Sequence, residues 1–148
     1  MCFFINFYND MPVIISLLPL LYWVYLIDPF TSKIPKRNYL RLYRDKKYLF
    51  INLGISLLFI VVGLNMRLRG DIELQISVFT PLLFILISLF LNKYMLKSKG
   101  RDFKFILRGD MEELWSIDML FSLILFVLPV VLSFYLEVKS IRLLGQNY

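Results

Sequence analysis

The sequence predicts an all-α protein that crosses a lipid bilayer four times. Three observations support this fold class: a composition that is 59% hydrophobic with a mean hydropathy of +0.68, four long apolar runs, and basic residues gathered between those runs. Soluble domains contain about 45–50% apolar residues, so water is not the main solvent of this chain. We expect a single four-helix transmembrane domain over residues 1–148.

The four apolar runs approach the length of a membrane-spanning helix. A helix needs about 20 residues, at a rise of about 1.5 Å each, to cross about 30 Å of hydrocarbon. The last three runs fit this length readily. The first is marginal, and the aromatic stretch before it suits a membrane interface. The predicted spans are residues 11–27, 48–66, 76–96 and 117–136.

Three prolines lie in or near the predicted helices. Pro19 and Pro129 are internal, and each removes a backbone hydrogen bond. Pro81 falls in or near the first turn of the third helix, where proline is tolerated. We therefore expect kinks at the two internal prolines and none at Pro81.

The Lys and Arg residues predict how the chain is oriented. None precedes the first span, seven lie in loop one, two in loop two, six in loop three and two after the last span. The positive-inside rule places loops one and three on the cytoplasmic or mitochondrial matrix side, with both termini opposite (N-out/C-out). This topology accounts for the net charge of +6, so we expect no nucleic acid partner.

Loop one combines basic residues with Tyr and Leu in a roughly helical pattern, and we expect it to continue the second helix into the interface. A basic amphipathic segment there binds acidic lipid head groups or an acidic partner. The alternative is an ordinary flank that only sets the topology. The candidate contact residues are Arg37, Tyr39, Arg41, Tyr43, Arg44 and Lys47.

Loop three is less regular. Gly100 is expected to end the third helix, and the apolar alternation from Arg101 to Leu107 suits a short strand or an interfacial edge. Asp110 and Glu113 are spaced as a capping pair that starts the fourth helix.

Asp118 is the one acid expected to be partly buried near the start of the fourth helix. Its candidate partners are Arg108, Lys47 and the side chain of Asn52. The alternative is a carboxylate that the helix macrodipole favours without any specific partner.

Small and polar side chains fall on one face of each of the last three helices. Such residues let membrane helices approach closely and hydrogen-bond across the contact, at about 0.6 kcal/mol per bond. The predicted helix-packing residues are Asn52, Ser56, Gly63, Ser77, Ser88, Asp118, Ser122 and Ser133.

Several kinds of chemistry lack the residues they need. The sequence contains no histidine and a single cysteine, Cys2. No Asp, Glu, Lys or Arg lies within about two turns of any predicted span centre, although proton relays and voltage sensors use such groups. We therefore expect no enzyme activity, no cofactor and no metal. A pore formed by an oligomer stays open as an alternative, since rings of hydroxyl or amide side chains can line one.

Composition also carries a resemblance. The chain has no alanine but 16 Ile, 14 Phe and 30 Leu, which is typical of a coding sequence under A+T pressure. In composition and number of spans it resembles the small hydrophobic subunits that protist mitochondrial genomes, such as those of ciliates, encode for respiratory-chain complexes. The resemblance implies a non-catalytic accessory subunit of a respiratory-chain or ATP-synthase complex in the mitochondrial inner membrane. Its partners would be other membrane subunits and lipids, anionic ones included.

A second class has the same size and number of spans. The chain is also similar in size and number of spans to small four-span proteins of A+T-rich bacteria that serve in the cytoplasmic membrane as immunity proteins against pore-forming toxins or as pore-forming defence effectors. Such a protein would be stable when expressed alone, whereas an accessory subunit would need its complex.

Overall fold

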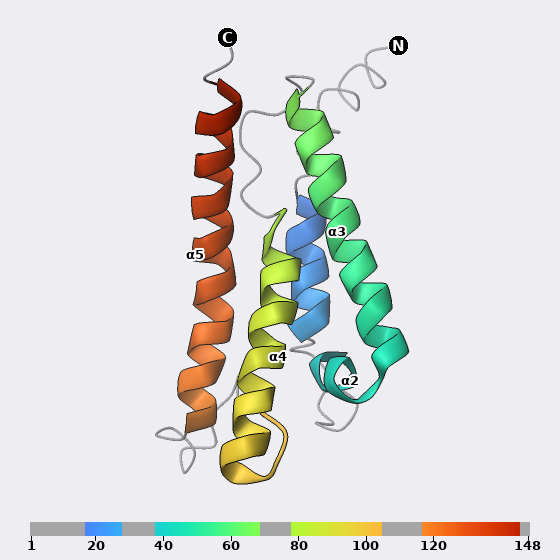
Figure 1. Ribbon diagram of the computed structural model, residues 1–148, viewed down its shortest axis with the longest axis vertical. Coiled ribbons are helices and arrows are strands. Elements are labelled where there is room, and N and C mark those ends of the chain that lie inside the picture. The colour runs from blue at the N-terminus through green and yellow to red at the C-terminus, as the bar shows by residue number, and fades with distance from the viewer. Residues whose placement is uncertain (1–16, 28–37, 69–77, 105–116, 146–148) are drawn as a thin grey trace, which may run out of the picture.

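The computed structural model describes residues 17–27, 38–68, 78–104 and 117–145 (Figure 1). These residues form the helix Leu17–Ile27, which carries no label in the figure, together with α2 (Asn38–Arg44), α3 (Lys46–Leu68), α4 (Thr80–Lys99) and α5 (Ile117–Gly145). The described part contains no strand, which confirms the all-α prediction there. In loop three, residues 101–104 are not a strand, while Phe105 and Leu107 lie outside the described residues.

Three of these helices are long and apolar enough to cross a membrane. The qualifying segments are Lys46–Met66, Thr80–Lys99 and Ile117–Ser140. They identify the chain as an integral membrane protein. The helix Leu17–Ile27 is apolar but shorter, and residues 11–16 of the predicted first span lie outside the described residues.

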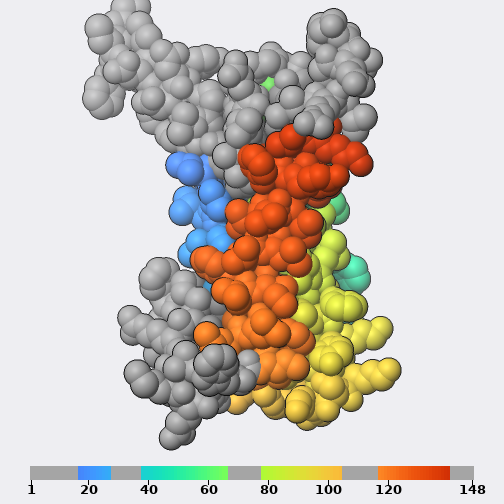
Figure 2. Space-filling model, turned by 90° about the vertical axis from the view of Figure 1, so that its left-hand side faces the viewer, coloured from blue at the N-terminus to red at the C-terminus, as the bar shows by residue number. Residues whose placement is uncertain are grey.

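The central helix is α4, which packs against α2, α3 and α5. Of its spanning segment 44% is buried, against 17% for α3 and 22% for α5. Successive long helices run in opposite directions, so α2 and the segment after α4 lie at the same end of the bundle (Figure 1). Viewed from the side, α5 forms the near face with α4 beside it (Figure 2). The end that holds α2 is called the basic end below.

Both ends of α4 follow from local residue types. Pro81 lies in the first turn, as expected, because its missing N–H has no partner to lose there. Gly100 ends the helix with φ of 67°, a left-handed conformation that glycine adopts without steric cost, and its N–H bonds to the Leu96 carbonyl at 3.1 Å. The predicted break at Gly100 is therefore confirmed.

Loop one differs from the prediction. It does not extend α3 in a straight line, because α2 is a separate short helix that lies across the end of α3 (Figure 1). The two helices meet at Asp45, whose Oδ1 accepts the Tyr48 N–H at 3.2 Å. This is the position of an N-cap side chain, and an N-cap starts a new helix. Asp45 is an N-cap residue type, but the prediction for loop one rested only on its continuous amphipathic pattern.

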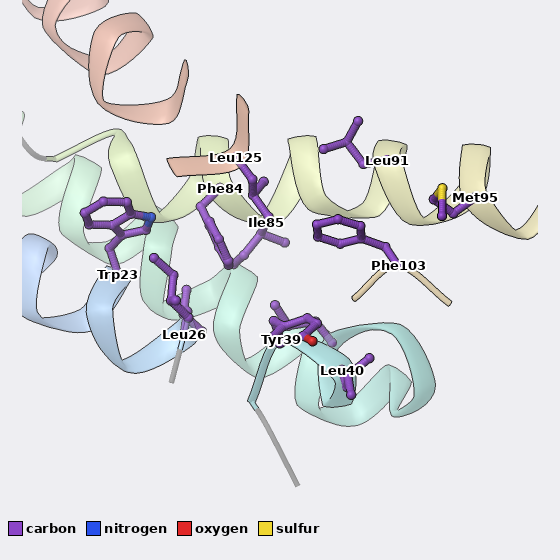
Figure 3. Packing of buried hydrophobic residues seen from close by; sticks show 12 residues of the cluster. Trp23, Leu26, Tyr39, Leu40, Phe84, Ile85, Leu91, Met95, Phe103 and Leu125 are labelled. Carbon is purple, nitrogen blue, oxygen red and sulfur yellow. The ribbon is translucent and has the colours of Figure 1, made fainter. Parts of the chain in front are cut away.

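Buried aromatic and aliphatic side chains from the first helix, α2, α4, α5 and the segment after α4 meet in one core (Figure 3), and partly buried side chains of α3 pack against it. Trp23 and Leu26 come from the first helix, and Phe84 from the middle of α4. Near the basic end, the Phe103 ring lies 6.4 Å from the Tyr39 ring and 6.3 Å from the Phe121 ring, measured between centroids. Phe103 thus joins loop three to α2 and α5.

The outward faces of the helices are strongly apolar. Phe90 on α4 and Phe50 on α3 are 71% and 70% exposed, and α3 and α5 carry long rows of exposed Leu, Val and Ile. In water such a surface would drive aggregation, whereas lipid chains solvate it. The burial pattern thus agrees with a membrane environment.

Phe103 should be a main source of stability at the basic end. Replacing this fully buried residue with Ala should lower the free energy of unfolding by about 3 kcal/mol, through lost contacts and a cavity. The matched control is Phe90→Ala, at an exposed position, which should change it by less than about 0.5 kcal/mol. Thermal unfolding of the detergent-solubilised chain measures both, and equal effects would show that Phe103 is not a core residue.

Candidate functional site: a polar clasp at the basic end

Asp102 connects three elements at the basic end. Arg44, the last residue of α2, donates to its Oδ2 from Nε at 3.0 Å and from Nη2 at 2.8 Å. Asn92 of α4 donates to Oδ1 at 3.3 Å. A two-pronged guanidinium bond fixes direction as well as distance, so Asp102 holds α2 against α4.

Asn92 is the buried centre of this arrangement, at 5% exposure. Its side-chain oxygen accepts the Phe103 N–H at 2.7 Å, while its amide nitrogen donates to Asp102. The backbone after Gly100 is not helical, so its N–H groups need side-chain acceptors. Asn92 supplies one and so sets the position from which the Phe103 ring enters the core.

Asp118 is the second acceptor for this segment, and its partner differs from those expected. It pairs with Arg101, through a 3.4 Å bond from Nη1 and a closer one from Nη2, and it accepts the Lys104 N–H at 3.2 Å. The reason is Gly100, which reverses the chain and carries Arg101 back to the start of α5. Asp118 is buried, at 3% exposure, in the first turn of α5, where the helix macrodipole also favours a carboxylate.

We call these residues the clasp: Arg44, Asn92, Arg101, Asp102, Phe103 and Asp118. Its two ion pairs differ in environment. In the Arg44–Asp102 pair the side chains are 61% and 23% exposed, whereas the Asp118 side chain is 4% exposed beside a half-exposed Arg101. Exposed pairs contribute little, while removing the partner of a buried charge is costly. The Arg101–Asp118 pair should therefore dominate.

The first helix is attached to α3 by hydroxyl and amide groups. Tyr22 donates its hydroxyl to the side-chain oxygen of Asn52, which is 2% exposed, and Asn52 donates to the Tyr48 carbonyl at 2.6 Å. The Tyr48 hydroxyl donates to the Tyr25 hydroxyl at 3.3 Å. Tyr22 was missed from sequence because packing residues were sought only among the small and polar side chains of the last three helices.

The structure buries the predicted helix-packing residues that it describes. These are Asn52, Ser56, Gly63, Ser88, Asp118, Ser122 and Ser133, while Ser77 lies outside the described residues. Three of the serines donate hydrogen bonds within their own helices. Ser56, Ser88 and Ser122 donate to carbonyls of their own helices, at 2.8, 2.9 and 2.6 Å. A serine hydroxyl that donates within its own helix can still accept a bond from a neighbouring one, and its small size lets the helices approach closely.

The predicted head-group contacts divide into buried and free residues. Tyr39 is fully buried against Phe103, and Arg44 is bound to Asp102. The Tyr43 hydroxyl is also buried, and burial raises the pKa of this phenol far above its ordinary value. Neither tyrosine is placed to meet a head group. Arg41 and Lys47 remain exposed, and Arg37 lies outside the described residues.

Glu137 is a buried acid that the sequence reading overlooked. It lies near the opposite end of α5 at 1% exposure, and its Oε1 accepts the Val78 N–H at 3.2 Å and the Ser133 hydroxyl at 3.5 Å. The signal was available, because Glu137 follows Ser133 by four residues on the buried face of α5. The predicted span ended one residue too early to include it.

All four carboxylates of the described residues have structural partners. Asp45 and Glu137 accept backbone N–H groups, Asp102 binds Arg44, and Asp118 binds Arg101. No group of three His, Cys, Asp or Glu side chains within that part of the chain could hold a metal ion. The chain matches no known protein family, no curated protein and no solved structure. The clasp is thus interpreted from its own geometry.

The two ion pairs of the clasp can be ranked by experiment. Arg101→Gln should lower the free energy of unfolding by about 1–2 kcal/mol, because it leaves the buried Asp118 without its guanidinium while water still screens the site. Arg44→Gln, the matched control, should cost at most about 0.5 kcal/mol. Denaturant titration in detergent compares the two variants. A larger loss for Arg44→Gln would contradict the ranking.

Glu137 should act as a hydrogen-bond acceptor for the start of α4. Glu137→Leu removes the acceptor and leaves the Val78 N–H unsatisfied, at a cost of about 1–3 kcal/mol. Glu137→Gln keeps a carbonyl oxygen at the same place and should cost clearly less. Thermal unfolding measures both variants, and the reverse order would mean that the negative charge matters more than the bond.

Proposed function

We propose that this protein is a non-catalytic subunit that scaffolds a larger membrane complex by packing its helices against partner subunits. The observation that carries the proposal is the use of every described carboxylate to fix helix ends and the clasp. Ionisable groups are costly within membrane proteins and are usually retained for function. Here their bonds build a rigid helical unit, which is what a scaffold needs.

The outer surface supports the same proposal. The exposed residues of α3 and α5 are large and apolar over most of the membrane-spanning length, so they suit neighbouring helices and lipid. The described residues turn their polar side chains inward or toward the helix ends. A substrate pathway through the bundle would need a row of polar groups lining it, whereas buried groups such as Asn52, Asn92 and Asp118 are bonded to other groups of the chain.

The setting that we propose is a respiratory-chain or ATP-synthase complex of the mitochondrial inner membrane. This rests on the alanine-free, Ile- and Phe-rich composition. We also propose four spans, with the basic end in the matrix and both termini opposite. The shared position of α2 and residues 100–104 at one end of the bundle supports that orientation.

Native extraction tests whether the chain belongs to a complex. The membrane is solubilised in a gentle detergent and separated on a native gel, and the band that holds this chain is analysed by mass spectrometry. We expect co-migration with respiratory or ATP-synthase subunits. Migration alone or as a small homo-oligomer would contradict the proposal and favour the bacterial immunity protein or defence effector.

Two matched positions locate the partner. A photo-crosslinking residue is placed at Val131 on α5 or at Val61 on α3, which are 55% and 65% exposed on outward faces. A protein adduct in native membranes at either position supports a neighbouring subunit and identifies it by mass. Lipid adducts alone at both positions would argue against subunit packing on these helices.

A further inference from the structure

The outer face of α3 combines a cation with a continuous apolar surface. Lys47, Ile51, Gly54, Leu58 and Val61 follow one another at offsets of 4, 7, 11 and 14 residues. On a helix of about 3.6 residues per turn these positions lie within about 40° to either side of Lys47, so together they cover about 80° of the helix surface. All five are exposed, so they form one stripe on the surface of the bundle. We call it the α3 stripe.

A second cation, Arg41, lies near the Lys47 end of the α3 stripe. The Arg41 guanidinium lies 4.3 Å from the centre of the Tyr48 ring, on the residue that follows Lys47. Stacking on the ring fixes the guanidinium in place and leaves its N–H edge free to donate. Within the described residues neither Arg41 nor Lys47 pairs with a carboxylate, and nearby Asp45 is turned to the Tyr48 N–H.

The stripe also has room for a chain along its middle. A Cβ built on Gly54 would meet nothing within 4 Å, so the helix surface is open and shallow there. Leu58 and Val61 continue the surface and are 61% and 65% exposed. From Lys47 to Leu58 the stripe is about 16 Å long, which is half of the roughly 30 Å hydrocarbon thickness and so matches one leaflet.

We propose that the α3 stripe binds an anionic phospholipid, with Arg41 and Lys47 on its phosphate and an acyl chain along Ile51, Gly54 and Leu58. The proposal rests on the membrane placement of the proposed function and names the ligand of its basic end. The positive charges of Arg41 and Lys47 favour an anionic ligand over a neutral one. A neutral lipid or an apolar helix would cover the apolar part but offer no anion to two cations that pair with no carboxylate of the described residues.

The test uses the full-length chain in a nonionic detergent, titrated with phosphatidylglycerol or with phosphatidylcholine of the same acyl chains and followed by native mass spectrometry. The wild-type chain should prefer phosphatidylglycerol. At about fivefold per cation near an anionic group, Lys47→Gln should lower that affinity about fivefold, and the Arg41→Gln, Lys47→Gln double variant about 25-fold. Affinity for phosphatidylcholine should stay unchanged.

Two control variants separate the site from general charge and from misfolding. Lys139→Gln removes one exposed charge at the opposite end of the bundle and should leave the preference intact. Gly54→Leu fits the open space without disturbing the fold, and it should weaken both lipids several-fold by occupying the acyl-chain path. The proposal is overturned if the wild-type chain shows no preference for phosphatidylglycerol, or if Lys139→Gln has the effect expected of Lys47→Gln.

Crosslinking in native membranes separates this proposal from that of the scaffold. A photo-crosslinking residue at Leu58 should yield a phospholipid adduct. A protein adduct would overturn the lipid assignment and support subunit packing on α3. A lipid adduct in a chain that migrates alone on a native gel would uphold the lipid site while contradicting the scaffold.

Discussion

The structure depends on one constraint: backbone N–H groups that leave a helix inside a bilayer-sized bundle must find acceptors within the protein. Lipid offers none, and each unsatisfied group is costly. The chain meets this constraint with side chains from neighbouring elements. The acceptor is a side-chain oxygen in each case: Asn92 for the Phe103 N–H, Asp118 for Lys104, Glu137 for Val78 and Asp45 for Tyr48. Each of these bonds also fixes where one element stands against another.

Helix α5 supplies the acceptors for segments at both ends of α4. Asp118 accepts from the segment that follows α4, and Glu137 accepts from the residue just before it. The two acids are 19 residues apart in α5, or about 28 Å along its axis, which is close to the hydrocarbon thickness. Between them the buried face of α5 carries Ser122, Leu125, Pro129 and Ser133. The charges therefore lie near the two interfaces, and the membrane interior is left to packing.

Sequence reasoning reached the features that local periodicity and residue type decide. The presence of three long helices in the last two thirds of the chain, the break at Gly100 and the placement of Pro81 depend on neighbours a few residues away, and they follow from general rules. The partner of Asp118 could not be predicted from local sequence, because the position of Arg101 depends on how the chain reverses direction at Gly100. The direction of α2 is similar, since both a straight and a bent path fit the same amphipathic pattern. Partners that are distant in sequence are known only when the three-dimensional path of the chain is known.

Some basic residues of this end bind carboxylates and others stay exposed, although the positive-inside rule counts them alike. Arg44 and Arg101 present planar guanidinium groups to carboxylates and hold the clasp together. Lys46, Lys47, Lys93 and Lys97 stay exposed, where a flexible ammonium group is well hydrated and contributes mainly charge. Orientation in the membrane depends on the total positive charge of this end, whereas the fold depends on the planar geometry of the two guanidinium groups that bind carboxylates. Exchanging Arg101 for Lys would therefore preserve the charge that directs insertion while removing the two-pronged contact that anchors loop three to α5.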